Sequence, residues 1–86
     1  SRDERFRAKP FPDLYTEACR VLQVEPGSAV ALEDSSNGVK AAKAAGLWAI
    51  AVPCSVTRSL DFTGADLVTD SLAEFRLADL KKLMAD

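Results

Sequence analysis

The sequence predicts an α/β fold in which a parallel β-sheet is flanked by helices. Two apolar segments, residues 29–32 and 47–52, have the composition of buried strands, and a helix rich in small residues is expected between them. Strands that alternate with helices of this length are joined by right-handed crossovers and therefore form a parallel sheet. The expected order is helix, strand, helix, strand, strand, helix.

The first helix is expected to begin at Asp13 and to run for about three turns. Apolar side chains recur there with the 3.6-residue period of an amphipathic helix. Pro12 suits the first turn of a helix, and the turn-forming residues 25–28 end it. Residues 1–9 are mostly polar, and we expect them to form an arm or loop ahead of one domain, or part of one, over residues 10–86.

The first strand is expected at residues 29–32, where apolar residues follow one another without alternation, as in a strand covered on both faces. The second helix is expected from Asn37 to Ala45, with Gly46 as its C-terminal stop. Residues 47–52 form the second strand and residues 67–69 a short third one.

The last helix is expected to begin with a capping box, in which a serine at the cap is followed three residues later by a glutamate. Ser71 and Glu74 have this spacing. The helix should direct five apolar side chains toward a core: Leu72, Phe75, Leu80, Leu83 and Met84.

Composition excludes several function classes. The 86 residues carry a net charge of −2 with scattered basic residues, which argues against a nucleic-acid groove or an anionic membrane surface. The longest apolar stretch, residues 44–53, is far shorter than the roughly 20 residues that span a bilayer. The absence of histidine excludes Ser-His and Cys-His catalysis and most zinc sites. Cys19 and Cys54 lack metal-ligand spacing, so a reduced, cytoplasmic protein is expected.

The candidate site lies where the first strand ends. Glu33 and Asp34 follow the strand directly, and ligands of open parallel sheets bind beyond the carboxyl ends of the strands. Two adjacent carboxylates repel unless a cation lies near them, and Mg²⁺ is commonly held by one or two carboxylates with phosphate and water. The alternative is that Asp34 caps the second helix while Glu33 is solvated.

Two further features could serve the same site. The second helix directs its N-terminus there, and such a terminus favours an anion; Ser35 and Asn37 add polar groups, as cofactor-binding residues or merely as caps. Lys9 precedes Pro10, which restricts its backbone to extended conformations. A lysine held in this way can neutralise a phosphoryl group, although a solvated surface lysine is the simpler interpretation.

Two stretches, KPFPDLY at residues 9–15 and ALEDSSNGVKAAKAAGLWAIAV at residues 31–52, resemble the haloacid-dehalogenase-like superfamily in motif, separation and order of elements. The closer resemblance is to its β-phosphoglucomutase-like and phosphoglycolate-phosphatase-like branch, and it covers nearly all of the chain from residue 9 onward. The resemblance implies a three-layer Rossmann-like parallel sheet with flanking helices. This chain would be the C-terminal part of that core, and therefore an incomplete one.

The resemblance also implies roles for the candidate residues. Lys9 would steady the nucleophile and the phosphate, Asp34 would bind Mg²⁺, and Glu33 would bind it directly or through water. Ser35 would support the two acids. The implied reaction is phosphoryl transfer from a small phosphorylated metabolite through an aspartyl-phosphate.

The superfamily's nucleophile motif, Asp-x-Asp-x-Thr, does not occur in these 86 residues. The chain alone should therefore be inactive, and the strand Ala29–Leu32 should be an uncovered edge that pairs with the missing N-terminal half or with a second copy. Two alternatives stay open: a non-catalytic module that binds magnesium, phosphate or a protein, and one half of a split enzyme.

Overall fold

The structure is a computed structural model that describes residues 6–70 and 77–85. The described strands form one parallel sheet in the order β1-β2-β3: β1 is Val30–Glu33, β2 is Trp48–Ala51 and β3 is Leu67–Val68. The described helices are α1 (Asp13–Leu22), α2 (Ser36–Ala44), α3 (Leu77–Met84) and the short 3₁₀ turn η1 (Pro26–Ser28). The predicted α/β class and the parallel sheet are confirmed.

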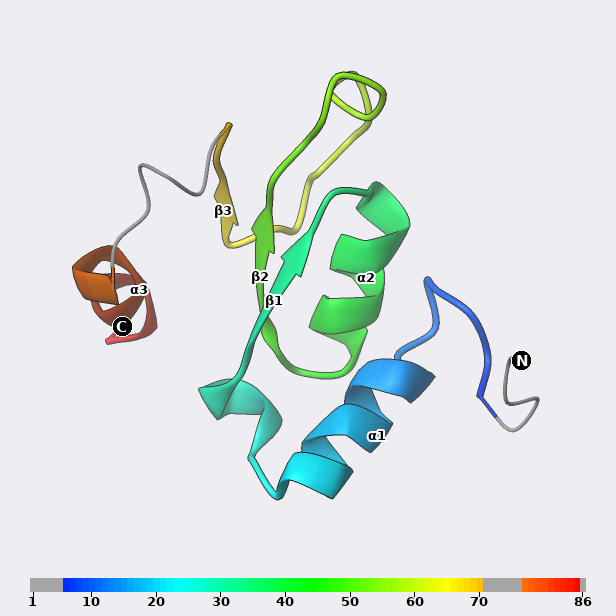
Figure 1. Cartoon of the computed structure of the whole chain (residues 1–86), viewed down its shortest axis with the longest axis vertical. Helices are drawn as coiled ribbons and strands as arrows, with labels where there is room; N and C mark the ends of the chain where they lie inside the picture. Colours follow the sequence, from blue (N-terminus) through cyan, green and yellow to red (C-terminus); the bar gives the residue numbers. More distant parts are fainter. Residues whose placement is uncertain (1–5, 71–76, 86) are drawn as a thin grey trace.

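All three strands end at the same edge of the sheet (Figure 1). Glu33 lies opposite Ala51 in the β1–β2 pairing, and Ile50 lies opposite Leu67 in the β2–β3 pairing. The N-terminus of α2 and the long loop after β2 extend beyond this carboxyl edge. The fold therefore has the carboxyl edge beyond which the sequence analysis places the candidate site.

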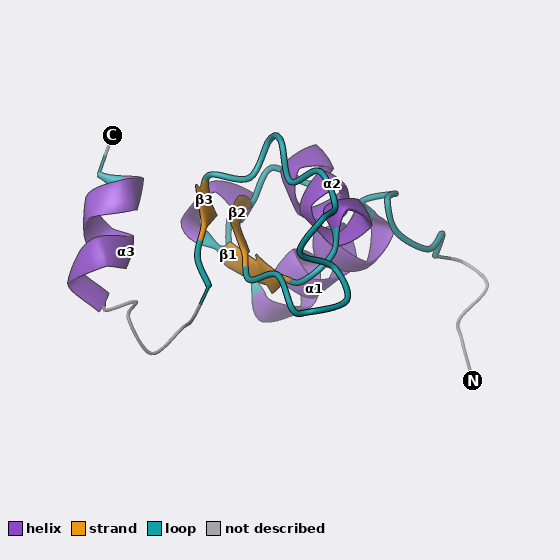
Figure 2. Ribbon diagram, turned by 90° about the horizontal axis from the view of Figure 1, so that it is seen from above, coloured by secondary structure: helices purple, strands orange, loops and turns teal. Residues whose placement is uncertain are grey.

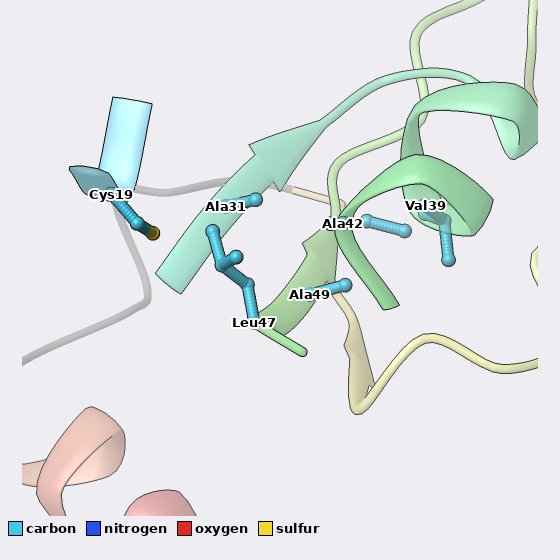
Figure 3. Close-up of a cluster of buried hydrophobic side chains, with 7 residues drawn as sticks. Cys19, Ala31, Val39, Ala42, Leu47 and Ala49 are labelled. Carbon is cyan, nitrogen blue, oxygen red and sulfur yellow. The ribbon is translucent and has the colours of Figure 1, made fainter. Parts of the chain in front are cut away.

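The core consists mainly of small side chains between α2 and the sheet (Figure 3). Ala42 of α2 and Ala49 of β2 are both 0% exposed, and Val39 is 1% exposed. Small residues allow the helix to lie close on the strands, as the sequence predicts. Gly46, with a φ of 90°, ends the helical segment in the left-handed conformation that glycine tolerates, which confirms its predicted role.

The first strand differs from the prediction in position and in burial. It begins one residue later than expected and includes Glu33, which the sequence placed in the loop beyond the strand. Burial alternates along it: Ala31 and Glu33 are buried, whereas Leu32 is 53% exposed. The expectation of a strand covered on both faces is therefore wrong for the described part of the chain. Alternation is the rule for a strand with one covered face.

The last helix lies on the other side of the sheet from α1 and α2 (Figures 1 and 2). Its apolar residues Leu80, Leu83 and Met84 are half-buried and do not belong to the buried cluster, contrary to expectation. The predicted capping box and the side chains of Leu72 and Phe75 fall outside the described residues. No helix in the described ranges has the length and apolar character needed to cross a membrane.

Asp66 joins β3 to the rest of the sheet at the amino edge. Its carboxylate accepts hydrogen bonds from the Ala49 amide at 2.8 Å and from the Lys43 ammonium at 2.9 Å. Burial acts to raise the pKa of the Asp66 carboxyl, but these hydrogen bonds outweigh it and hold the pKa below its ordinary value. The ionised form is therefore favoured by folding.

We expect Asp66→Asn to lower the free energy of unfolding by about 1 kcal/mol at pH 7, a value kept small because Lys43 is partly solvated. The pKa of Asp66 is lower in the folded protein than its unfolded value of about 3.9. The stability that the ionised carboxylate contributes is therefore complete above the unfolded pKa, and it is lost as the pH falls through the folded pKa. Urea titrations of both proteins between pH 7 and pH 2.5 measure it. The two curves should converge at the acidic end, and a gap independent of pH would contradict the assignment.

Candidate functional site

Glu33 and Asp34 lie at the carboxyl end of β1 and differ in burial. β1 ends at Glu33, and Asp34 is the first residue after the strand. The Glu33 side chain is 6% exposed and faces α2, whereas Asp34 is exposed. The two adjacent acids therefore differ in their surroundings, one buried and one open to solvent.

Lys9 supplies the charge that Glu33 needs. Its Nζ lies 3.0 Å from both Oε1 and Oε2 of Glu33, across 24 positions of sequence. A buried carboxylate is costly unless it is paired, and this two-point contact pairs it. The Lys9 ammonium also lies 5.7 Å from the centre of the Tyr15 ring in α1, a cation–π distance. The structure thus brings Lys9 and Glu33 together, and Lys9 remains 42% exposed.

Asp34 lies near the loop that follows β2. The hydrogen bond with the Thr57 hydroxyl holds the pKa of the Cys54 thiol below its ordinary value, and the charge of Asp34 acts in the opposite direction. Asp34 is therefore within electrostatic reach of Cys54, at the same edge of the sheet as the Lys9–Glu33 pair. The described residues contain no group of three Asp, Glu, Cys or His side chains placed to hold a metal ion. Of the predicted site residues, Lys9 and Glu33 are the two that the structure shows in direct contact.

Ser35 is the N-cap of α2, since its Oγ accepts a hydrogen bond from the Gly38 amide at 3.1 Å. The capping interpretation is therefore correct for Ser35, and it fixes where the helix begins. Asn37 is exposed in the first turn of α2. The N-terminus of α2 lies at the carboxyl edge (Figure 1), and a helix N-terminus favours an anion.

Arg7 and Asp13 form an ion pair that joins the two ends of the loop carrying Lys9. The sequence did not suggest this contact. Arg7 binds Asp13 through its backbone N and its Nε, at 2.9 and 3.1 Å from Oδ2, and through Nη2, 3.0 Å from Oδ1. The Arg7 guanidinium also lies 4.2 Å from the centre of the Phe11 ring. The hydrogen bonds from Arg7 hold the pKa of the Asp13 carboxyl below its ordinary value. A spacing of six residues across two prolines gives no helical or strand signal that could have revealed this contact.

The chain matches known proteins over most of its length. The sequence profile of the haloacid dehalogenase-like hydrolases matches residues 1–46. The bifunctional riboflavin kinase/FMN phosphatase of Arabidopsis thaliana is 43% identical over 75 residues, which are 87% of this chain and 20% of that protein. The structure of CbbY from Rhodobacter sphaeroides in complex with xylulose-1,5-bisphosphate is 53% identical, with a TM-score of 0.83 over 86% of this chain and 33% of CbbY.

A β-phosphoglucomutase from Clostridium difficile shares the fold, with a TM-score of 0.78 and 23% identity over 92% of this chain and 34% of that protein. The chain therefore spans a third or less of the length of the riboflavin kinase/FMN phosphatase and of CbbY. The predicted resemblance and the predicted branch are confirmed by these matches. The chain belongs to the haloacid dehalogenase-like hydrolase family, and it is similar to part of a phosphatase of that family.

Proposed function

We propose that this chain supplies the lysine and a metal-binding carboxylate of a magnesium-dependent phosphohydrolase or phosphomutase. The enzyme would act on a small phosphorylated metabolite through an aspartyl-phosphate. The observation that carries the proposal is the Lys9 ammonium, which Glu33 holds at 3.0 Å from both carboxylate oxygens at the carboxyl edge of the sheet. The sugar bisphosphate bound to CbbY supports a phosphorylated sugar as the substrate class.

Lys9 is suited to neutralise a phosphoryl group. Phosphoryl transfer depends on positioning and on charge neutralisation more than on covalent chemistry by the protein. The Glu33 contact fixes the direction of the lysine side chain, while its 42% exposure leaves the ammonium accessible from the edge. The first turn of α2 adds N–H groups for an anion, and Asn37 lies in this turn.

The oxygen donors at this edge fit a hard divalent cation in kind but are too few to hold it alone. Glu33 is occupied by Lys9, which leaves the exposed carboxylate of Asp34 as the direct ligand in this proposal. Mg²⁺ is usually held by one or two carboxylates, with water and substrate phosphate completing its shell. When bound, the ion would neutralise charge on the transferred phosphoryl group. Glu33 would then act by holding Lys9.

The nucleophile is not supplied by these 86 residues, because they contain no Asp-x-Asp-x-Thr motif. The proposed reaction therefore needs a second segment of protein beside β1. β1 is an edge of the described sheet, and α1 presents Leu14 and Val21, 51% and 62% exposed, to solvent. We place the remaining part of the core against the backbone of residues 29–32 and this face of α1, with self-association as the competing outcome. The free thiols of Cys19 and Cys54 support a reducing, cytoplasmic location for the enzyme.

A chimaera tests the proposed activity. Residues 1–86 would replace the matching segment of CbbY from Rhodobacter sphaeroides, and the product would be assayed with xylulose-1,5-bisphosphate and with p-nitrophenyl phosphate. We expect hydrolysis that is abolished by EDTA and restored by Mg²⁺, and no turnover by the 86-residue chain alone. A folded chimaera without activity would indicate a non-catalytic module instead. Size-exclusion chromatography of the isolated chain at several concentrations separates self-association from a monomer whose edge is left for the missing half.

A further inference from the structure

Gly38 is the third residue of α2 and is buried. Its backbone does not require glycine: the described glycines with positive φ are Gly46 and Gly64, and Gly38 has a helical conformation that any residue can adopt. In a helix, glycine is about 1 kcal/mol less favourable than alanine. A glycine at this position therefore needs a reason other than backbone conformation.

The space beside Gly38 is filled by the side chain of Glu33. A Cβ added to Gly38 would overlap Oε1 and Cδ of Glu33 and would lie 3.0 Å from its Cγ. Oε1 and its partner oxygen Oε2 are the two atoms that accept hydrogen bonds from Lys9. The carboxylate that holds Lys9 thus rests directly on the backbone of Gly38.

The backbone of Gly38 cannot easily move away from Glu33. Its amide donates to the Oγ of Ser35, which caps the helix. Val39, the next residue, is 1% exposed and belongs to the buried cluster. A larger residue at position 38 would therefore displace Glu33 rather than the helix.

We infer that Gly38 is a positioning residue for the candidate site, because the absence of a side chain there seats the Glu33 carboxylate and thereby aims the Lys9 ammonium. Gly38 would act through Glu33 and Lys9, since its own amide is bound to the Oγ of Ser35. The consequence for phosphoryl transfer rests on the proposed function, but the seating of Glu33 does not.

A double-mutant cycle in the 86-residue chain tests the seating. We expect Gly38→Ala to lower the melting temperature by roughly 5–15 °C, although alanine is the better helix former. In a Glu33→Gln background, which keeps the shape of the side chain, the loss should persist. In a Glu33→Ala background, which empties the space, Gly38→Ala should be neutral or should raise the melting temperature. Gly27→Ala is the matched control, because a Cβ at Gly27 meets no atom within 4 Å.

A spectroscopic measurement separates positioning from stability alone. Ammonium protons held by a carboxylate exchange slowly enough to give a lysine side-chain signal in ¹H–¹⁵N spectra. We expect the Lys9 signal in the wild type and in Gly27→Ala, and its loss in Gly38→Ala at a temperature where that variant is folded.

Three results would overturn the inference: a Gly38→Ala variant as stable as the wild type, an equal loss of stability in the Glu33→Ala background, or an unchanged Lys9 signal. If Gly38→Ala does not fold at all, recovery of the fold by Glu33→Ala still supports the seating, and failure to recover refutes it. An inactive chimaera would remove the proposed function and leave these results unaffected.

Discussion

Asp34→Asn in the CbbY chimaera is expected to lower kcat/KM by at least about a hundredfold, since removal of a single electrostatic partner of a transition state commonly costs that much. The amide keeps the size of the side chain but loses the charge that a divalent cation requires. Asp34 is exposed at the carboxyl edge, so its substitution should leave the fold intact. Activity against Mg²⁺ concentration is the measurement, and the variant should need more metal to reach its maximal rate.

Asp61→Asn is the control for this prediction. Asp61 is also an exposed acid, in the loop after β2, and it accepts a hydrogen bond from the Thr63 amide at 2.8 Å, which an asparagine can still accept. We expect its activity to stay within about twofold of the parent, because its carboxylate is engaged by Thr63 and has no role in the proposed metal site. An Asp34→Asn variant that is as active as this control, with the same dependence on Mg²⁺, would exclude Asp34 as a metal ligand.

The Lys9–Glu33 pair is expected to serve function while contributing little net stability. Lys9→Met should lower the free energy of unfolding by about 2 kcal/mol, because Glu33 would remain buried without its partner. The figure is below the roughly 3–5 kcal/mol of a fully buried pair because the Lys9 side chain is 42% exposed, so water can reach the carboxylate. Adding Glu33→Met should recover most of the loss, since a buried ion pair can often be replaced by apolar residues without cost.

The same two variants separate stability from activity when they are placed in the chimaera. The Lys9→Met/Glu33→Met protein should be nearly as stable as the parent in urea titrations and should still be inactive. Lys40→Met is the control, because Lys40 is an exposed lysine of α2. A double variant that is less stable than Lys9→Met alone would show that the ion pair contributes net stability, and retained activity would remove Lys9 from the reaction.

Element type and order were predictable because they depend on local periodicity. The apolar period of 3.6 residues located α1 at Asp13, and the small residues between two apolar segments located α2 within one residue of its bounds. The parallel sheet followed from the alternation of strands and helices. The predicted type and order of the elements stay correct even when a boundary is misplaced by one residue.

The predicted direction of a side chain, by contrast, is reversed when a strand boundary is misplaced by one residue. The strand expected at residues 29–32 lies at Val30–Glu33, and this shift turns Glu33 from a loop acid into a buried strand residue. Its partner Lys9 is 24 positions away, and a separation of that length carries no periodic signal. The contact between Glu33 and Gly38 could not be predicted from the sequence either. A glycine inside a helical pattern predicts only a weak helix. The three-dimensional structure is needed to show that Glu33 occupies the space beside it.

A crystal structure of the chimaera with Mg²⁺ and phosphate tests the central claim most directly. We expect a carboxylate oxygen of Asp34 about 2.1 Å from the ion and the Lys9 ammonium within about 3 Å of a phosphate oxygen, with Glu33 still bound to Lys9. Magnesium and phosphate bound at the carboxyl edge without contact to Asp34 and Lys9, or bound elsewhere on the protein, would contradict the account.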